Sequence, residues 1–149
     1  MALEGQSVLV SIARGLTREL NDATFSLPFE AERRYTLIDA AHDLADLHVS
    51  VIPQKVTIKT ASRGKDVHEY EIMVGVQQQV DERDVEFSVD PLVYLSEQVL
   101  DWLRQRKRLE DVPEAAFTGA SDEVTILNEH LQEHHLYTGV MVIKYEVYR

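Results

Sequence analysis

The sequence predicts an α+β domain in which two main α-helices pack on a mostly antiparallel β-sheet of about four to five strands. Three observations carry this prediction. Residues 137–149 alternate in polarity, residues 55–80 hold two alternating stretches around a turn, and residues 7–21 and 90–103 carry apolar side chains at helical spacing. Because an amphipathic helix and a one-sided sheet each need a partner to bury their apolar faces, we expect two layers.

The first helix is expected over residues 7–21. Ser7 suits the N-cap, since its hydroxyl can accept a hydrogen bond from a free backbone N–H of the first turn. Spacings near three and four place one apolar stripe on this helix, formed by Val8, Leu9, Ile12, Leu16 and Leu20.

Residues 21–46 form a polar segment that we interpret as either a short edge strand or an extended arm. Phe25, Leu27 and Phe29 alternate as they would in a strand. Pro28 lies between them and lacks the N–H that a central strand needs, which leaves the edge of a sheet or an arm.

Residues 47–80 are expected to form three antiparallel strands. Residues 47–52 read as a strand ended by Pro53, residues 55–60 as a second, and residues 67–80 as its long hairpin partner. One face of the long strand is apolar, with Tyr70, Ile72, Val74 and Val76. On its other face the isolated Gly75 indicates a bulge or a close backbone approach.

The second helix is expected to begin at Asp90 as the cap, with Pro91 in the first turn where no hydrogen bond is lost. Its apolar face consists of Leu92, Leu95, Val99, Trp102 and Leu103. We interpret residues 81–89 as a charged connector, residues 110–121 as a loop and residues 123–127 as a short strand.

The final strand closes the domain. Met141, Ile143, Tyr145 and Val147 share one side at period two, so this side should be buried against the helices. The opposite side becomes polar toward the end of the chain and is expected to be partly solvated.

The composition argues against several classes of function. The 149 residues include 26 acidic and 15 basic side chains, a net charge of −11 that opposes general binding to DNA or anionic lipid. The absence of cysteine excludes disulfides and thiol chemistry. No run approaches the roughly 18 apolar residues of a membrane span. We expect one soluble domain with no membrane partner.

One motif has a chemical precedent. His130, Glu133 and His134 follow the H-x-x-E-H order of inverted zinc peptidases, in which two histidines one helical turn apart bind zinc. A third ligand is needed, and Glu146 is the only side-chain carboxylate among the 15 residues after His134. We therefore predict a solvated or subunit-facing loop; adventitious metal binding and a hydrolase site are the alternatives.

The remaining candidates for catalysis are weak. His42, His48 and His68 are scattered singly near carboxylates, which is expected by chance in so acidic a chain. The sequence has neither a glycine-rich phosphate loop nor a nucleophile elbow. We predict no catalytic, cofactor or metal site, and hence a protein that is not an enzyme.

The best candidate for a partner contact is the turn formed by Arg63, Gly64, Lys65 and Asp66. It presents basic residues from an otherwise acidic protein, between two long strands. An ordinary hairpin loop is the alternative interpretation. Long hairpins on a compact sheet are nonetheless a common way for a subunit to reach its neighbours.

Taken in order, these segments resemble the tail terminator proteins (also called tail completion or neck proteins) of long-tailed bacteriophages. The resemblance rests on the helix over residues 7–20 and on residues 43–53, 70–77, 90–103 and 138–148. It covers nearly the whole chain as a pattern of hydrophobicity and turns.

The resemblance implies a structural subunit of the virion that assembles in the host cytoplasm. Members form a homo-oligomeric ring, commonly a hexamer, at the head-tail junction. The ring caps the tail tube protein and offers a surface to the head-tail connector or stopper protein. DNA would be only passing cargo, and residues 21–46 could reach a neighbouring ring. A head-completion or stopper protein, and an unrelated soluble enzyme or small-molecule binder, are the alternatives.

Overall fold

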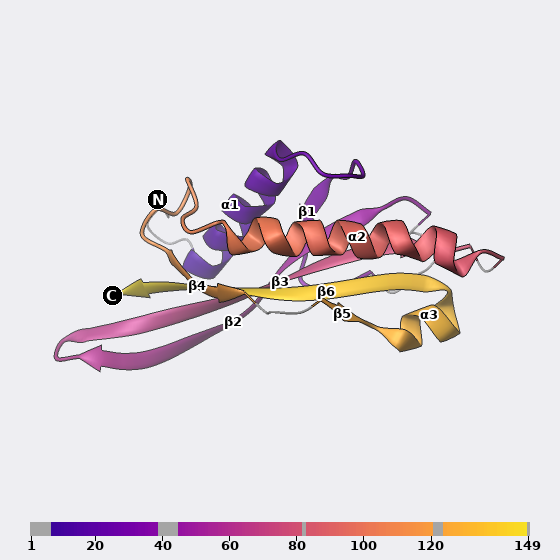
Figure 1. Cartoon of the computed structure of the whole chain (residues 1–149). Helices are drawn as coiled ribbons and strands as arrows, with labels where there is room; N and C mark the ends of the chain where they lie inside the picture. The colour runs from indigo at the N-terminus through magenta and orange to yellow at the C-terminus, as the bar shows by residue number, and fades with distance from the viewer. Residues whose placement is uncertain (1–6, 39–44, 82, 121–123, 149) are drawn as a thin grey trace.

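The computed structural model describes residues 7–38, 45–81, 83–120 and 124–148. Two long helices, α1 (Val8–Asp22) and α2 (Val85–Arg104), cover one face of a six-stranded sheet, as the predicted α+β class requires (Figure 1). The strands are β1 (Ala31–Arg33), β2 (His48–Ser62), β3 (Lys65–Gln79), β4 (Ala116–Ala120), β5 (Thr125–Ile126) and β6 (Leu136–Tyr148). A short helix, α3 (Asn128–His134), joins β5 to β6.

The sheet has the order β1-β2-β3-β6-β4, with β5 also paired to β6. Its centre is antiparallel, and β6 pairs with β3 over its whole length, from Leu136 opposite Gln79 to Tyr148 opposite Val67. The sheet is mixed because β1 runs parallel to β2. The strand count exceeds the predicted four to five because short strands complete the edges. Among the described residues, no helix is long and apolar enough to cross a membrane.

The buried core lies between the helices and the sheet. The predicted inner side of β6 is confirmed, since Met141, Ile143, Tyr145 and Val147 are all buried. They join one apolar cluster with the inner side of β3 and the buried stripes of α1 and α2. The last strand is therefore integral to the fold.

Helix α1 begins and ends close to prediction. The Ser7 hydroxyl accepts a hydrogen bond from the backbone N–H of Val10 at 3.2 Å, which confirms the N-cap. The stripe residues Ile12, Leu16 and Leu20 are at most 1% exposed.

The predicted start of α2 is wrong. The helix begins at Val85, and Asp84 is its N-cap, accepting a hydrogen bond from the N–H of Phe87 at 3.2 Å. Pro91 consequently lies inside the helix, where its ring leaves the Phe87 carbonyl without the usual donor four residues on. The predicted connector over residues 81–89 is largely the first turn of this helix.

The two strands predicted around Pro53 are one strand, β2. The register of its pairing with β3 shifts between Pro53 and Lys55, and the strand continues to Ser62. An irregularity in the pairing is where a strand tolerates a residue without an N–H.

The described part of the 21–46 segment lies against the domain. Phe25, Leu27 and Phe29 pack on the core without forming a strand, and the edge strand is Ala31–Arg33 instead. Residues 39–44 lie outside the described residues.

Two further predictions were wrong about local structure. The predicted loop at 110–121 contains β4, whose Phe117 ring meets Tyr145 of β6 edge to face with centroids 6.2 Å apart. The H-x-x-E-H segment, predicted as a loop, is the helix α3. Both β4 and α3 pack against β6. A local sequence pattern does not indicate such a contact with a distant strand.

Candidate functional site

The outer half of the β2–β3 hairpin, residues 54–69, is largely exposed, and we call it the outer hairpin. It projects beyond the end of the helical layer (Figure 1). Val56 and Ile58 lie opposite Tyr70 and His68, on the face that the helices cover nearer the base. Past the end of that cover, Val56 is 43% and Ile58 60% exposed.

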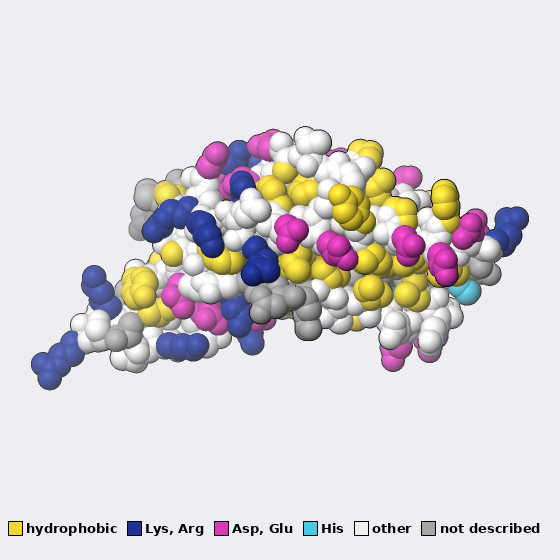
Figure 2. Space-filling model, viewed as in Figure 1, with side chains coloured by type: hydrophobic (Ala, Val, Ile, Leu, Met, Phe, Trp, Pro, Cys, Tyr) yellow, Lys and Arg dark blue, Asp and Glu magenta, His cyan; other side chains and the backbone are white. Residues whose placement is uncertain are grey.

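The predicted contact residues lie together at the tip. Ser62 pairs with Lys65, so Arg63 and Gly64 form the turn. Gly64 has φ +77°, a conformation that suits glycine because it has no Cβ. Arg63, Gly64 and Lys65 are exposed and Asp66 is half-buried. The tip is therefore a basic end on an acidic protein, visible at lower left in Figure 2.

The sheet face away from α1 and α2, which we call the open face, carries alternating charges. Lys144 on β6 lies 3.9 Å from Glu69 and 3.8 Å from Glu71. On the other side, Lys59 lies 3.9 Å from Glu69 and Lys55 lies 4.0 Å from Glu71. Each carboxylate thus has two ammonium groups within 4.0 Å, an arrangement that ties strands together.

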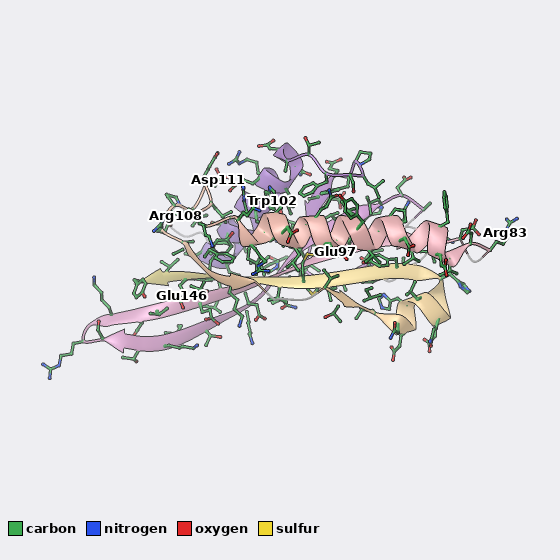
Figure 3. The ribbon with its side chains drawn as sticks, in the orientation of Figure 1. Arg83, Glu97, Trp102, Arg108, Asp111 and Glu146 are labelled. Atoms are coloured by element: carbon green, nitrogen blue, oxygen red, sulfur yellow. The ribbon has the colours of Figure 1, made fainter. Side chains whose placement is uncertain are left out.

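Three of these charged residues, Glu69, Glu71 and Lys144, line a shallow hollow of about 560 Å³ on the open face. Its other lining residues are Thr118, Gly119, Val142 and Glu146, the last of which is labelled on β6 in Figure 3. The hollow holds neither a histidine nor a nucleophile beside a base, so it offers no set of groups for acyl transfer.

The first histidine of the H-x-x-E-H motif contacts a side chain of β6. His130 Nδ1 lies 2.7 Å from Thr138 Oγ1, and the same hydroxyl lies 3.3 Å from the side-chain nitrogen of the buried Gln77. Glu133 is exposed, and the side chain of His134 lies outside the description. Within the described ranges, no group of three or more histidine, cysteine or acidic residues is placed to hold a metal ion.

The other histidines are separate. His68 stacks on Tyr70 with ring centroids 6.4 Å apart, at the outer hairpin. His48 begins the partner strand β2 and pairs with Gln77, at the end of the hairpin opposite the tip. His42 lies outside the described residues. The structure does not bring His48 and His68 together.

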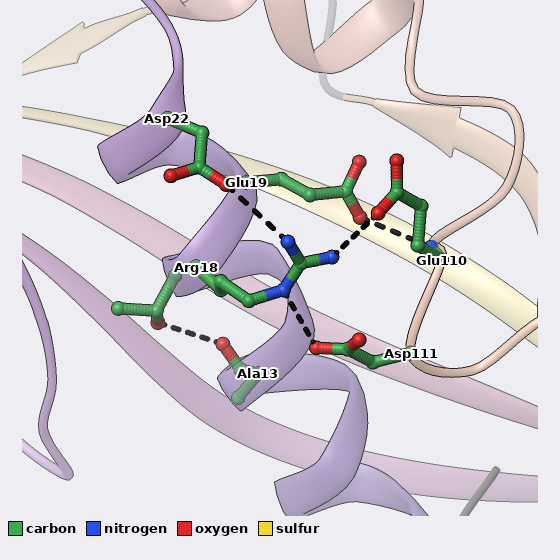
Figure 4. Close-up of polar contacts among 7 residues, drawn as sticks. Ala13, Arg18, Glu19, Asp22, Glu110 and Asp111 are labelled. Atoms are coloured by element: carbon green, nitrogen blue, oxygen red, sulfur yellow. Dashed lines mark hydrogen bonds and ion pairs between the residues drawn. The ribbon is translucent and has the colours of Figure 1, made fainter.

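A cluster of ion pairs on α1 holds the loop that follows α2 (Figure 4). Arg18 donates to Asp111 at 3.0 Å and to Glu110 at 2.9 Å, and hydrogen bonds to these two carboxylates raise the pKa of Arg18. Burial raises the pKa of Glu19, whose carboxylate accepts the N–H of Glu110 at 3.2 Å. The cluster fixes a loop and has the character of a structural clamp.

The prediction overlooked the outer face of α2. Phe87 is 80% and Tyr94 57% exposed there, beside Glu97 and other acidic residues. Figure 2 shows a row of acidic side chains along this helix, with apolar side chains between them. A helical projection of the polar face reveals these aromatic residues among the carboxylates, whereas the apolar face alone does not.

Comparison with protein-family models finds none that matches this chain, and comparison with curated proteins finds no match either.

Proposed function

We propose that this chain is a ring-forming structural subunit of the tail-terminator type. It would cap the tail tube of a long-tailed bacteriophage and give the head a surface to join. The observation that carries this proposal is the outer hairpin. An arm with exposed Val56 and Ile58 and a basic tip, on an otherwise well-packed domain, is suited to hold a neighbouring subunit.

The ordered resemblance of the sequence to tail terminators supplies the class of assembly. In this role the chain has no catalytic task, and its partners are further copies in a ring, commonly six, the tail tube protein and the connector or stopper protein. The net charge of −11 suits a conduit wall, because like charge lets DNA pass without adhering. The site of action is the head-tail junction of the virion.

Electron microscopy of the purified chain tests the ring. We expect closed particles with a central hole, and a chain that stays monomeric at high concentration contradicts the proposal.

Deletion of the gene from its phage tests the role. The expected result is DNA-filled heads without tails, beside tail tubes of abnormal length. Detached heads beside tails of normal length favour the stopper or head-completion alternative, and normal particles exclude both.

A further inference from the structure

The outer face of α2 is an unpartnered stripe of carboxylates and aromatic rings. At 100° per residue, its members fall within about 100° of the helix circumference. They are Glu86, Phe87, Asp90, Tyr94, Glu97 and Asp101. We call this set the α2 stripe. Two aromatic residues more than half exposed on one helix face form an apolar surface that the fold itself does not use.

Part of the α2 stripe borders a hollow of about 420 Å³. Phe25, Tyr94 and Trp102 contribute aromatic surface, and Glu97 and Asp101 contribute carboxylates. Figure 3 shows Glu97 and Trp102 on α2. Among the ion pairs of the described residues, none involves Glu97 or Asp101. Aromatic surface beside carboxylates is the environment that a lysine or arginine side chain prefers.

The outer hairpin has the complementary chemistry. Its tip carries the exposed cations Arg63 and Lys65, and its helix-side face carries the exposed aliphatic residues Val56 and Ile58. It projects past the helical layer and away from α2 of its own chain (Figure 1). The two surfaces are different patches of one subunit, so a contact between them joins two copies. The ring of the proposed function requires this contact to run head-to-tail, not reciprocally as in a two-fold dimer.

The lengths of the two surfaces agree. From Arg63 back to Ile58 is five strand residues, about 17 Å. From Glu97 back to Phe87 is ten helical residues, about 15 Å. A tip seated between Glu97 and Asp101 therefore brings Ile58 close to Phe87.

We propose that the outer hairpin of one copy docks along the α2 stripe of a second copy. Arg63 or Lys65 enters the hollow beside Glu97 and Asp101, and Ile58 packs on Phe87. This inference rests on the proposed function, since it names the surfaces by which ring subunits join. Repetition of the same head-to-tail contact closes a ring when the rotation between copies allows it.

Cross-linking tests the contact directly, because the chain has no cysteine of its own. The variants Arg63→Cys and Asp101→Cys are mixed and treated with a short bis-maleimide. We expect covalent dimers from the mixture and none from either variant alone. Ile58→Cys mixed with Phe87→Cys should cross-link as well, which tests the register. Arg63→Cys mixed with Glu114→Cys is the matched control, as Glu114 is exposed on the loop after α2.

Charge reversal gives a second measurement. Arg63→Glu should raise the concentration for half-assembly about tenfold, equivalent to about 1.4 kcal/mol. Adding Asp101→Arg to the same chain should restore assembly, because every contact then regains opposite charges. Arg14→Glu, an equal charge change on exposed α1, should leave assembly unchanged.

The outcomes separate this inference from the proposed function. Closed rings without either specific cross-link overturn the inference and leave the ring role intact. Cross-linked open chains that never close support the contact and reject the ring. Monomers at high concentration, without a cross-link, overturn both the inference and the ring role.

Discussion

The two halves of the β2–β3 hairpin follow one alternating pattern in opposite surroundings. At the base, Ile72 and Val74 are fully buried under the helices, and Gln77 on the other face is fully buried as well. In the outer hairpin, Val56 and Ile58 continue the helix-side face and are 43% and 60% exposed. The two halves share the same strands and the same pairing, and they differ only in whether helices cover them.

The difference shows that strand periodicity determines which side chains share a face of the sheet, but does not determine whether that face is buried. Burial comes from helices whose lengths are set elsewhere in the chain. Apolar residues beyond the cover add little to folding, so their hydrophobic free energy is available for association. The comparison predicts that substitutions at the base alter stability, whereas those in the outer hairpin alter assembly.

Substitutions at Ile72, in the base, and at Ile58, in the outer hairpin, are expected to differ most in their effect on stability. Ile72→Lys should abolish soluble folded protein, because it removes burial of about 1.5–3 kcal/mol and adds an unpaired buried charge to a fold stabilised by about 5–15 kcal/mol. Ile58→Lys should leave thermal melting nearly unchanged and weaken assembly. Circular dichroism and sedimentation measure the two effects. Equal losses of melting temperature would show that the outer hairpin belongs to the folding core.

The open face at the base offers the next test. The Gln77 side chain accepts from the Ile38 N–H at 3.0 Å and donates to the Ile38 carbonyl at 2.7 Å. Gln77→Ala leaves two buried backbone groups unpaired, so unfolding in urea should require about 2 kcal/mol less. The control is Gln78→Ala, which should change stability by less than about 0.5 kcal/mol. Equal effects of the two changes would remove the distinction.

The sequence predicts this fold best where the signals are local. The Ser7 cap, the stripe of α1, the hairpin and the alternation of β6 each depend on neighbouring residues. The start of α2 was missed because Asp90 and Pro91 mimic a helix start, while the helix is capped by Asp84, six residues earlier. Strand β4 could not be found locally, since its pairing with β6 defines it.

The candidate site also has a part that the sequence predicts and a part that it does not. The four tip residues are contiguous, so their grouping is predictable, but the length of exposed strand beneath them is not. Gly75 was interpreted as a bulge or a close approach. The structure shows neither a bulge nor an approaching backbone: the β3 register is continuous through Gly75, and the Leu37 side chain is what occupies the space that a Cβ would need. A segment from elsewhere in the chain had to be placed before that could be known.

Alkaline pH should weaken the covered base. Burial raises the pKa of Tyr145, and it also raises the pKa of Tyr137, whose hydroxyl lies 2.8 Å from Ser96 Oγ. A folded-state pKa above the unfolded value of about 10 means that the stabilisation is complete below pH 10 and is lost as pH rises. The loss is at most about 1.4 kcal/mol per pH unit for each tyrosine. Urea unfolding between pH 9 and 11 should show a shallower decline for Tyr145→Phe than for the parent chain.

The smallest effect is expected from the charges of the outer hairpin. Glu69 lies 3.9 Å from both Lys59 and Lys144, whose side chains are 63% and 44% exposed. Solvent around the ammonium groups screens these pairs, so Glu69→Gln should change the free energy of unfolding by less than about 1 kcal/mol. Raising the salt concentration should reduce even that difference, because the Debye length falls to about 3 Å at 1 M.

The Glu69→Gln measurement also tests the difference between the base and the outer hairpin. Glu69→Gln keeps the shape of the side chain and removes only its charge, so packing is preserved. Urea unfolding at low and high salt then isolates the Coulomb contribution of the outer hairpin. A loss above about 2 kcal/mol that persists in high salt would mean that these strands are held as tightly as the base. In that case Val56 and Ile58, on the opposite face of the same strands, are part of a stable structural element, and the division between a folding half and an associating half fails.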